Sequence, residues 1–438
     1  MSDIREHSQL QSPRSIFLFC VLGYLVLASY AVARPAVESL FLSVYSSEDL
    51  PRVWIAVAIG AVFTVGIYNR FAASRDLIQV FRVSVLVSMV SLLALLGLKQ
   101  LNESVGTFLM YVWKDIYIVV LVETFWSLAN TIFHTKQATK LYGIFCVAGS
   151  LGGMSANLGM GPLAKAYGTD TALLGIFPIL GLVWFMVGQA GRMAIPGAPG
   201  EAEGSLEAEK DSKASKKSSM SEGLKVLRNS PYLGALLALI CLVQVVITLV
   251  DYQFNAALED SFPDTDARTG AIGKVYAAID MGSLFLQLLA GPIIAFLGVS
   301  RVLLMIPIVV GMAVAGFALT PSFLVIAVAK VSGKCFDYSL FRAAKEMLYI
   351  PLSYAEKTQG KAVVDILTYR VAKGGASLLL MAIIAASVEG WVAWLCLGLV
   401  LAWILVTTGI VKRYALLVKD GLSAEEKSEQ VEISKEKV

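Results

Sequence analysis

Histidine and charge are both scarce in this 438-residue chain. It has two histidines, 16% charged residues and 57% hydrophobic residues, whereas soluble proteins carry about 25% charge. Two imidazoles argue against a histidine metal site and against a Ser-His-Asp arrangement, so we expect no metal, no other cofactor and no enzymatic activity. The net charge of +3 gives no sign of a nucleic-acid partner.

The chain also lacks a disulfide framework and a secretory signal. Its five cysteines are scattered through apolar segments without CxxC spacing, which is typical of small buried hydrophobic side chains. The apolar stretch from Ile16 to Ala33 is long for a signal peptide, and no cleavage signature follows it. We interpret this stretch as the first membrane span.

Long apolar runs dominate the rest of the sequence. They come in blocks of about 20 residues, the length that an α-helix needs to cross the hydrocarbon core of a bilayer. A membrane β-barrel would instead show short alternating strands. We predict an all-α integral membrane protein with twelve transmembrane helices, at 15–44, 52–69, 79–98, 105–131, 141–164, 171–191, 232–254, 271–297, 301–320, 322–345, 361–387 and 390–411.

Ionisable residues are unevenly distributed among these spans. They concentrate in the first, fourth, seventh and tenth spans, with some in the eighth and eleventh, whereas the apolar cores of the third, sixth, ninth and twelfth have none. A charge in a bilayer is costly unless it faces protein or a water-filled cavity. The charged spans are therefore expected to surround a polar path and the uncharged ones to face lipid, which is typical of a transporter.

Two groups of six spans joined by a polar segment describe the major facilitator architecture. The joining segment is rich in Gly, Ser, Ala and charges of both signs, so it buries too little surface to offset its ordering entropy. Basic residues concentrate in alternate loops, and the positive-inside rule places both termini in the cytoplasm. We predict an N-terminal six-helix bundle at 1–191, a flexible cytoplasmic linker at 192–230, a C-terminal six-helix bundle at 231–414 and a charged cytoplasmic tail at 415–438.

Glycine is frequent in the fifth span, over residues 148–162. No strand precedes this stretch and no lysine follows at phosphate-loop spacing, which argues against a nucleotide-cradling loop. Gly149, Gly153 and Gly161 are instead expected to allow close helix contact or a bend near Pro162.

The segment 338–377 reads YSLFRAAKEMLYIPLSYAEKTQGKAVVDILTYRVAKGGAS. It resembles a segment of the nucleotide transporter family, the ATP/ADP translocases of plastids and obligate intracellular bacteria. Shorter stretches resemble the same family in order along the chain: Phe125-Trp126 with Ala129-Asn130, Tyr142 with Phe145, Ser230-Pro231-Tyr232, and Leu249-Val250-Asp251. The resemblance implies the major facilitator fold and nucleotide transport, with ATP/ADP exchange the family's best-known mode.

The chain departs from the family pattern at positions that bear on the substrate. The family's first-span lysine is Val37 here, and the lysines that follow its acidic seventh-span residue are missing after Asp251. In the tenth span, Asp337 stands where the family has a second lysine. Cations and anions within the spans roughly cancel, so this charge balance does not demand a polyanionic substrate.

Candidate site residues follow from the resemblance and from charge chemistry. Arg and Lys coordinate phosphate oxygens, and a buried carboxyl group can carry a proton, but each of these residues can also belong to a structural ion pair. We predict substrate binding by Arg34, Lys114, Lys334, Arg370 and Lys373; gating or proton coupling by Glu38, Asp115 and Asp251; and a cytoplasmic mouth lined by Lys345, Glu346, Lys361 and Asp365.

The predicted function is secondary active transport of nucleotides by alternating access, as ATP/ADP exchange or as nucleotide uptake. We expect a monomer in the inner (cytoplasmic) membrane of a bacterium, with the small-molecule substrate and the lipid bilayer as its partners. The missing lysines leave an alternative open, a proton-coupled transporter of another organic solute on the same fold. A membrane enzyme or scaffold has little support, because the sequence shows no nucleophile constellation and no metal-ligand cluster.

Overall fold

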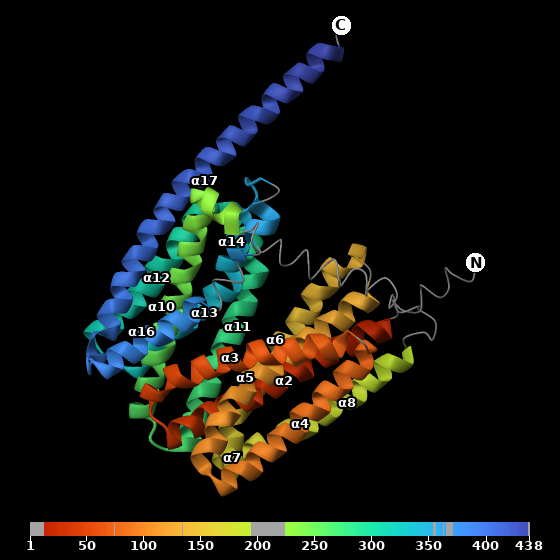
Figure 1. The fold of residues 1–438 in the computed structure, drawn as a ribbon, viewed down its shortest axis with the longest axis vertical. Coiled ribbons are helices and arrows are strands. Elements are labelled where there is room, and N and C mark those ends of the chain that lie inside the picture. Colours follow the sequence, from red (N-terminus) through yellow and green to blue (C-terminus); the bar gives the residue numbers. More distant parts are fainter. Residues whose placement is uncertain are drawn as a thin grey trace, which may run out of the picture. The chain divides into compact units, whose positions relative to one another are not determined.

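The computed structural model describes residues 13–73, 75–133, 135–193, 224–353, 356–361, 363–364 and 371–436. All regular structure within these ranges is helical (Figure 1), which confirms the predicted all-α class. The N-terminal half contains α2 (Pro13–Val44), η1 (Ser47–Asp49), α3 (Leu50–Ala72), α4 (Leu77–Leu101), α5 (Glu103–Ile132), α6 (Thr135–Tyr167), α7 (Thr169–Leu173) and α8 (Ile176–Met193). The C-terminal half contains α10 (Pro231–Ser261), α11 (Thr265–Leu297), α12 (Val299–Leu319), α13 (Phe323–Phe336), η2 (Asp337–Phe341), α14 (Arg342–Leu348), η3 (Glu356–Gly360), α16 (Lys373–Ala385), η5 (Glu389–Trp391) and α17 (Val392–Glu436).

Ten segments of the described chain are long and apolar enough to cross a membrane. They correspond to the first nine predicted spans and the twelfth. The predicted tenth span is divided, because α13 ends at Phe336 and a π-helical turn, η2, precedes α14. The predicted eleventh span lies partly outside the described residues, and α16 is its described apolar part. The count of twelve therefore stays a prediction, as does the linker, of which 194–223 lie outside the described residues.

The helices pack into two compact units. One consists of Met1–Ser205 and Phe254–Leu284, and the other of Leu206–Gln253 and Phe285–Val438. These limits fall inside α10 and α11, so both helices run from one unit into the other. The end of α10 and the first part of α11 thus pack with the N-terminal helices.

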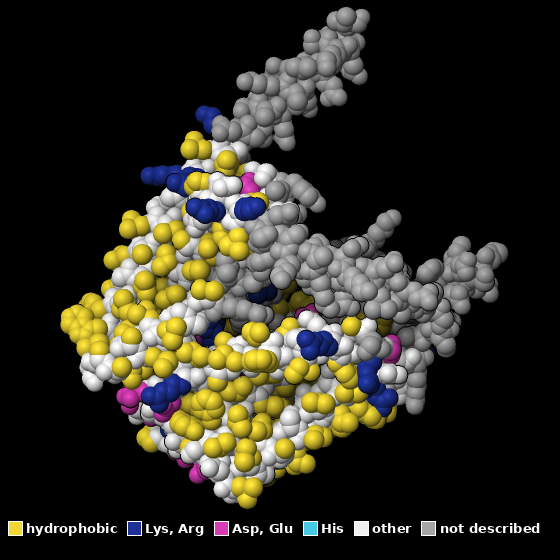
Figure 2. All heavy atoms as spheres, viewed as in Figure 1, with side chains coloured by type: hydrophobic (Ala, Val, Ile, Leu, Met, Phe, Trp, Pro, Cys, Tyr) yellow, Lys and Arg dark blue, Asp and Glu magenta, His cyan; other side chains and the backbone are white. Residues whose placement is uncertain are grey.

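Large hydrophobic side chains cover the outer faces of α3, α4 and α8 in the first unit. Ile59, Phe63, Val87, Leu93 and Phe185 are all exposed, and Figure 2 shows a nearly continuous hydrophobic surface over these helices. Exposed apolar surface of this extent is suited to lipid contact. The third and sixth spans, α4 and α8, are among these helices, and their charged residues lie near the helix ends, at Arg82, Lys99 and Arg192.

Small residues bring α2 and α6 together in the first unit. A Cβ atom on Gly149 would lie 2.9 Å from Leu27 Cδ1, and one on Gly152 would lie 2.9 Å from the Cα atom of Tyr24. A Cβ atom on Gly161 of α6 would likewise lie 3.2 Å from the Cα atom of Gly270 of α11. The expectation that Gly149 and Gly161 serve close helix contact is confirmed.

We predict that Gly152→Ala destabilises the protein, because the added methyl group would overlap the Tyr24 backbone, which cannot move without shifting α2. Overpacking of this kind costs about 1–3 kcal/mol. The midpoint of thermal unfolding in detergent should fall, whereas the control Gly159→Ala, with nothing within 4 Å on the same helix, should leave it unchanged. Equal midpoints for the two variants would contradict the close contact.

Candidate functional site

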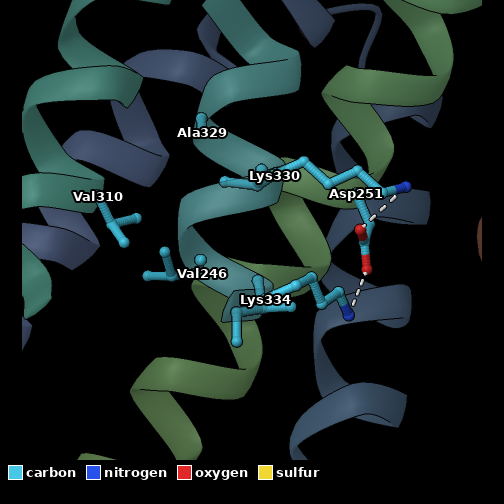
Figure 3. A pocket seen from close by; sticks show the side chains of 9 residues that line it. Val246, Asp251, Val310, Ala329, Lys330 and Lys334 are labelled. Atoms are coloured by element: carbon cyan, nitrogen blue, oxygen red, sulfur yellow. Dashed lines mark ion pairs between the residues drawn. The ribbon is translucent and has the colours of Figure 1, made fainter. Parts of the chain in front are cut away.

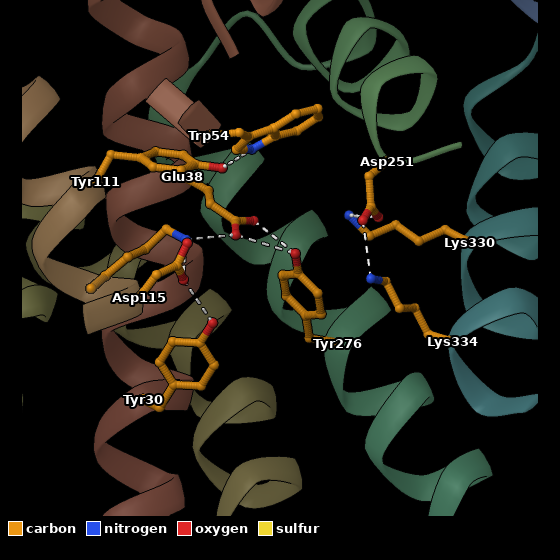
Figure 4. A network of polar contacts seen from close by, with 10 residues as sticks. Tyr30, Glu38, Trp54, Tyr111, Asp115, Asp251, Tyr276, Lys330 and Lys334 are labelled. Carbon is orange, nitrogen blue, oxygen red and sulfur yellow. Dashed lines mark hydrogen bonds and ion pairs between the residues drawn. The ribbon is translucent and has the colours of Figure 1, made fainter. Parts of the chain in front are cut away.

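A closed ring of charged and aromatic side chains lies inside the first unit, and Figure 4 shows its members Tyr30, Glu38, Asp115 and Tyr276. Three members are one helical turn apart on α2 and therefore share one face of that helix. Two come from α5 and one from α11. The six members of this charged ring are Tyr30, Arg34, Glu38, Lys114, Asp115 and Tyr276.

Lys114 is the most deeply buried charge of the ring, with 2% of its side chain exposed. Its Nζ atom lies 2.9 Å from Asp115 Oδ1 and 3.4 Å from Glu38 Oε1. The ammonium group also lies 4.1 Å from the centre of the Tyr111 ring. A buried ammonium needs such partners, because an uncompensated charge costs several kcal/mol. Lys114 therefore holds the two carboxylates together between α2 and α5.

Arg34 is held in a different way. Its guanidinium carbon lies 3.4 Å from the ring centre of Tyr276 and 4.8 Å from that of Tyr30. The hydroxyl groups of these tyrosines face the carboxylates: Tyr30 donates to Asp115 Oδ1 at 3.0 Å, and Tyr276 donates to both oxygens of Glu38 at 2.9 and 3.2 Å. Both tyrosines thus connect Arg34 to the acidic members.

The donors of Arg34 remain available. Among the described residues, none forms a hydrogen bond or an ion pair with Arg34, and its buried Nε atom has no partner. The side chain is partly exposed. A guanidinium group that is fixed in orientation and keeps its N–H donors is suited to binding a carboxylate or phosphate. The role of Arg34 as an anion contact stays a prediction.

The second unit contains a separate charged cluster around Asp251 of α10 (Figure 3). Lys330 and Lys334, one turn apart on α13, place their Nζ atoms 3.3 Å from Oδ1 and 3.0 Å from Oδ2 of Asp251. An electrostatic interaction also connects Asp251 to Lys373. Two ammonium groups share one carboxylate here, and Asp337, the first residue of η2, interacts electrostatically with Lys334 as a second acidic partner. Lys330, with 2% of its side chain exposed, is not among the contacts predicted from the sequence.

A small cavity adjoins this cluster. Its wall is apolar apart from the three charged side chains, and it is lined by Val246, Ile247, Val250, Asp251, Val310, Ala329, Lys330, Gly333 and Lys334. With a volume of about 10 Å³, the cavity has room for about one water molecule and not for a nucleotide.

The predicted cytoplasmic mouth is described in part. Lys361 forms an ion pair with Glu346 and lies 5.3 Å from the ring centre of Tyr349. Lys345 is half-buried. Asp365 and Arg370 lie outside the described residues, so their predicted roles stay predictions.

Several motif residues serve packing. Phe125, Trp126, Tyr142 and Phe145 form one aromatic cluster in the first unit, with ring centres 5.2–6.3 Å apart. In the second unit, the Tyr232 hydroxyl donates to the carbonyl oxygen of Leu348, so the SPY motif contacts the end of α14. These matches therefore stabilise the bundles around the charged clusters.

Solved structures of transporters share this fold. A variant of the nucleoside transporter NupG superposes with a TM-score of 0.67 at 9% identity, covering 90% of this chain and 99% of that one. A bacterial homologue of the iron transporter ferroportin, in an inward-facing state, gives 0.63 at 14% identity, covering 91% and 99%. Identities this low show the fold alone, which is the predicted major facilitator type.

Sequence relatives carry ADP,ATP carrier names. The chain is 26% identical to ADP,ATP carrier protein 1 of Chlamydia muridarum over 69% of its own length and 64% of the relative's. It is 24% identical to ADP,ATP carrier protein 3 of Rickettsia bellii, over 60% of each. It is also 24% identical to the chloroplastic ADP,ATP carrier protein 2 of Arabidopsis thaliana, over 71% of this chain and 55% of that one. The chain thus spans less than two thirds of the length of these relatives. A model of the TLC ATP/ADP transporter family matches residues 61–414, and the chain belongs to this family.

Proposed function

We propose that this protein is a secondary transporter that moves nucleotides across the cytoplasmic membrane by alternating access, in ATP/ADP-type exchange or in nucleotide uptake. Family membership supports this function, as do the ADP,ATP carrier names of the relatives. In this proposal the protein is a monomer with both termini in the cytoplasm. The parts that move during alternating access are the two six-helix bundles at 1–191 and 231–414.

The observation that carries this proposal is the pair of lysines that converge on Asp251. Lys330 is buried, Lys334 has 20% of its side chain exposed, and both contact this carboxylate. An ammonium group in a low-dielectric interior is stabilised by each anion near it. A nucleotide phosphate group beside Lys334 would supply such an anion.

Arg34 supports the same substrate class from the first unit. Its stacking on two tyrosine rings fixes the guanidinium plane, which lowers the entropy lost when an anion binds. In the proposed mechanism, Arg34 and Lys334 contact substrate, with Arg370 and Lys373 as further contacts. Lys114, already paired with two carboxylates, has fewer donors left for a phosphate.

A proton-coupled transporter of another organic solute is the second candidate. The carboxylates of Glu38, Asp115 and Asp251 support it, because all three lie in membrane-spanning helices beside basic partners. The same fold and the same alternating access apply to both candidates. They differ in the substrate and in the need for a proton gradient.

Counterflow in proteoliposomes separates these two functions. We expect vesicles loaded with ADP to accumulate labelled ATP, with no effect of an uncoupler, because exchange of nucleotides needs no proton gradient. Vesicles of the same lipid that contain ADP but no protein provide the control. Absence of ATP uptake, together with uncoupler-sensitive uptake of another solute, would support the second function and overturn the first.

Replacing Lys334 tests the charge argument. Lys334→Ala removes the more exposed of the two lysines that contact Asp251, so the substrate loses a cationic contact, and the exchange rate at low ATP concentration should fall at least about 10-fold. Lys334→Arg keeps the charge and should retain more activity. The control is Arg52→Ala, which removes an exposed pair with Asp49 that is worth little. Equal rates for Lys334→Ala and Arg52→Ala, at equal protein levels, would contradict the role of Lys334.

A further inference from the structure

We propose that Tyr276 is a positioning residue that couples the docking of α11 to the anion-binding state of Arg34. This inference rests on the proposed transport function, because it concerns how the same site gains and loses affinity for its substrate. Tyr276 is absent from the residues predicted from the sequence, and its role follows from contacts that join three helices.

One side chain makes two different contacts here. The ring of Tyr276 covers the guanidinium group of Arg34 at 3.4 Å, and its hydroxyl group donates to both oxygens of Glu38. The side chain is buried. The ring of Tyr276 therefore orients Arg34, and its hydroxyl group occupies the carboxylate of Glu38, one turn away from Arg34 on α2.

Glu38 is the competitor for Arg34 on α2, whereas Asp280, which also interacts electrostatically with Arg34, lies on α11 and moves with Tyr276. The two residues are four positions apart on α2, the spacing at which helical side chains of opposite charge pair. Arg34 nevertheless makes no ion pair with any described residue, since Glu38 accepts from Tyr276 and lies 3.4 Å from Lys114. Without the Tyr276 hydroxyl group, Glu38 can turn to Arg34 and take up the donors that would otherwise bind an anion.

The position of Tyr276 depends on how the beginning of α11 is docked. Ser39 of α2 donates to the carbonyl oxygen of Thr265 at 2.6 Å. Arg268, 3% exposed, donates to the carbonyl oxygens of Ser39, Phe262 and Pro263 at 2.9–3.2 Å. The two bonds to Ser39 tie α11 to α2, and the other two tie α11 to the connection that precedes it, two to three turns away from Tyr276.

A second set of contacts ties the same part of α11 to α7. Thr169 donates to Asp266 Oδ1 through both its backbone N–H and its hydroxyl group, at 2.7 Å each, and its hydroxyl group lies 2.8 Å from that of Thr269. The two bonds to the Asp266 carboxylate are charge-assisted and contribute about 1.5–3 kcal/mol each, net of their exchange for bonds to water. The docked position of α11 is therefore well defined, and water can replace these bonds when the helix moves.

Movement of α11 would change the charged ring in one step. The helix belongs to the first unit up to Leu284 and to the second from Phe285, and Tyr276 is the only ring member that it carries. Undocking removes the ring face from Arg34 and the donor from Glu38 together. Arg34 then pairs with Glu38 and releases its anion, so affinity falls when α11 leaves. Coupling of this kind needs two states that differ in their contacts. The docked and undocked positions of α11 differ in the contacts of both Arg34 and Glu38.

A double-mutant cycle tests this coupling in the purified protein. Tyr276→Phe keeps the ring but removes the hydroxyl group, so it should raise the dissociation constant of ATP about 10-fold, within the usual range of coupling between sites. Adding Glu38→Gln should restore the affinity, because a neutral amide does not compete for Arg34. Tyr111→Phe is the control, since it also removes the hydroxyl group of a buried tyrosine beside Lys114. Among the described residues, that hydroxyl group is hydrogen-bonded only to Trp54. An unchanged dissociation constant in Tyr276→Phe, or no restoration in the double variant, would overturn the proposal.

A readout without nucleotide distinguishes this proposal from the proposed function. The substitution Thr265→Cys reports on docking of α11. It leaves the docking bond in place, because Ser39 donates to the backbone carbonyl of residue 265 and not to its side chain. In detergent, Tyr276→Leu should increase the labelling rate of this cysteine by a hydrophilic maleimide several-fold over the same protein with Tyr276. If the wild-type chain binds no ATP but the rate rises, the coupling stands and the substrate is wrong. If the rate is unchanged, the coupling is wrong.

Discussion

The burial of Lys114 is the constraint on which the rest of the first unit depends. An ammonium group with 2% exposure in a membrane-spanning helix requires negative partners from more than one direction. Asp115 and Glu38 supply them, and the two tyrosines then join these carboxylates to Arg34. One buried charge thus organises three helices, α2, α5 and α11, around a single closed ring.

The two charged clusters solve the same desolvation problem with different balances. In the ring, each acidic side chain has a basic or hydroxyl partner, and one cation is left with its donors available. Around Asp251, two lysines share that carboxylate, and Asp337 interacts electrostatically with one of them, Lys334. Arg34 keeps its donors in one unit, and Lys334 keeps part of its side chain exposed in the other. A phosphate-bearing substrate would supply an anion to such groups.

Much of this organisation could be predicted from the sequence. Span length and hydropathy predicted the helical class, and the cost of buried charge selected the spans that now hold Arg34, Lys114, Asp251 and Lys334. The motif in 338–377 predicted the family. The π-helical turn at Asp337–Phe341 was not predicted, because hydropathy does not respond to one extra residue in a helical turn. The roles of Tyr30 and Tyr276 were not predicted either, since a tyrosine in an apolar span cannot be told from a core residue by sequence alone. Only the spacing of Tyr30, one turn before Arg34, was a usable signal.

The sequence by itself determined which helices are apolar, which carry charge and to which family the chain belongs, because these properties depend on residue type and on position along one segment. Only the tertiary structure decided which charge pairs with which, and hence that Lys114 is occupied while Arg34 is available. Pairing depends on distances between side chains of different helices, from α2 to α11, and such distances are set by packing. The glycine contacts of α6 show the same limit: the residues were visible in the sequence, whereas their neighbours were not.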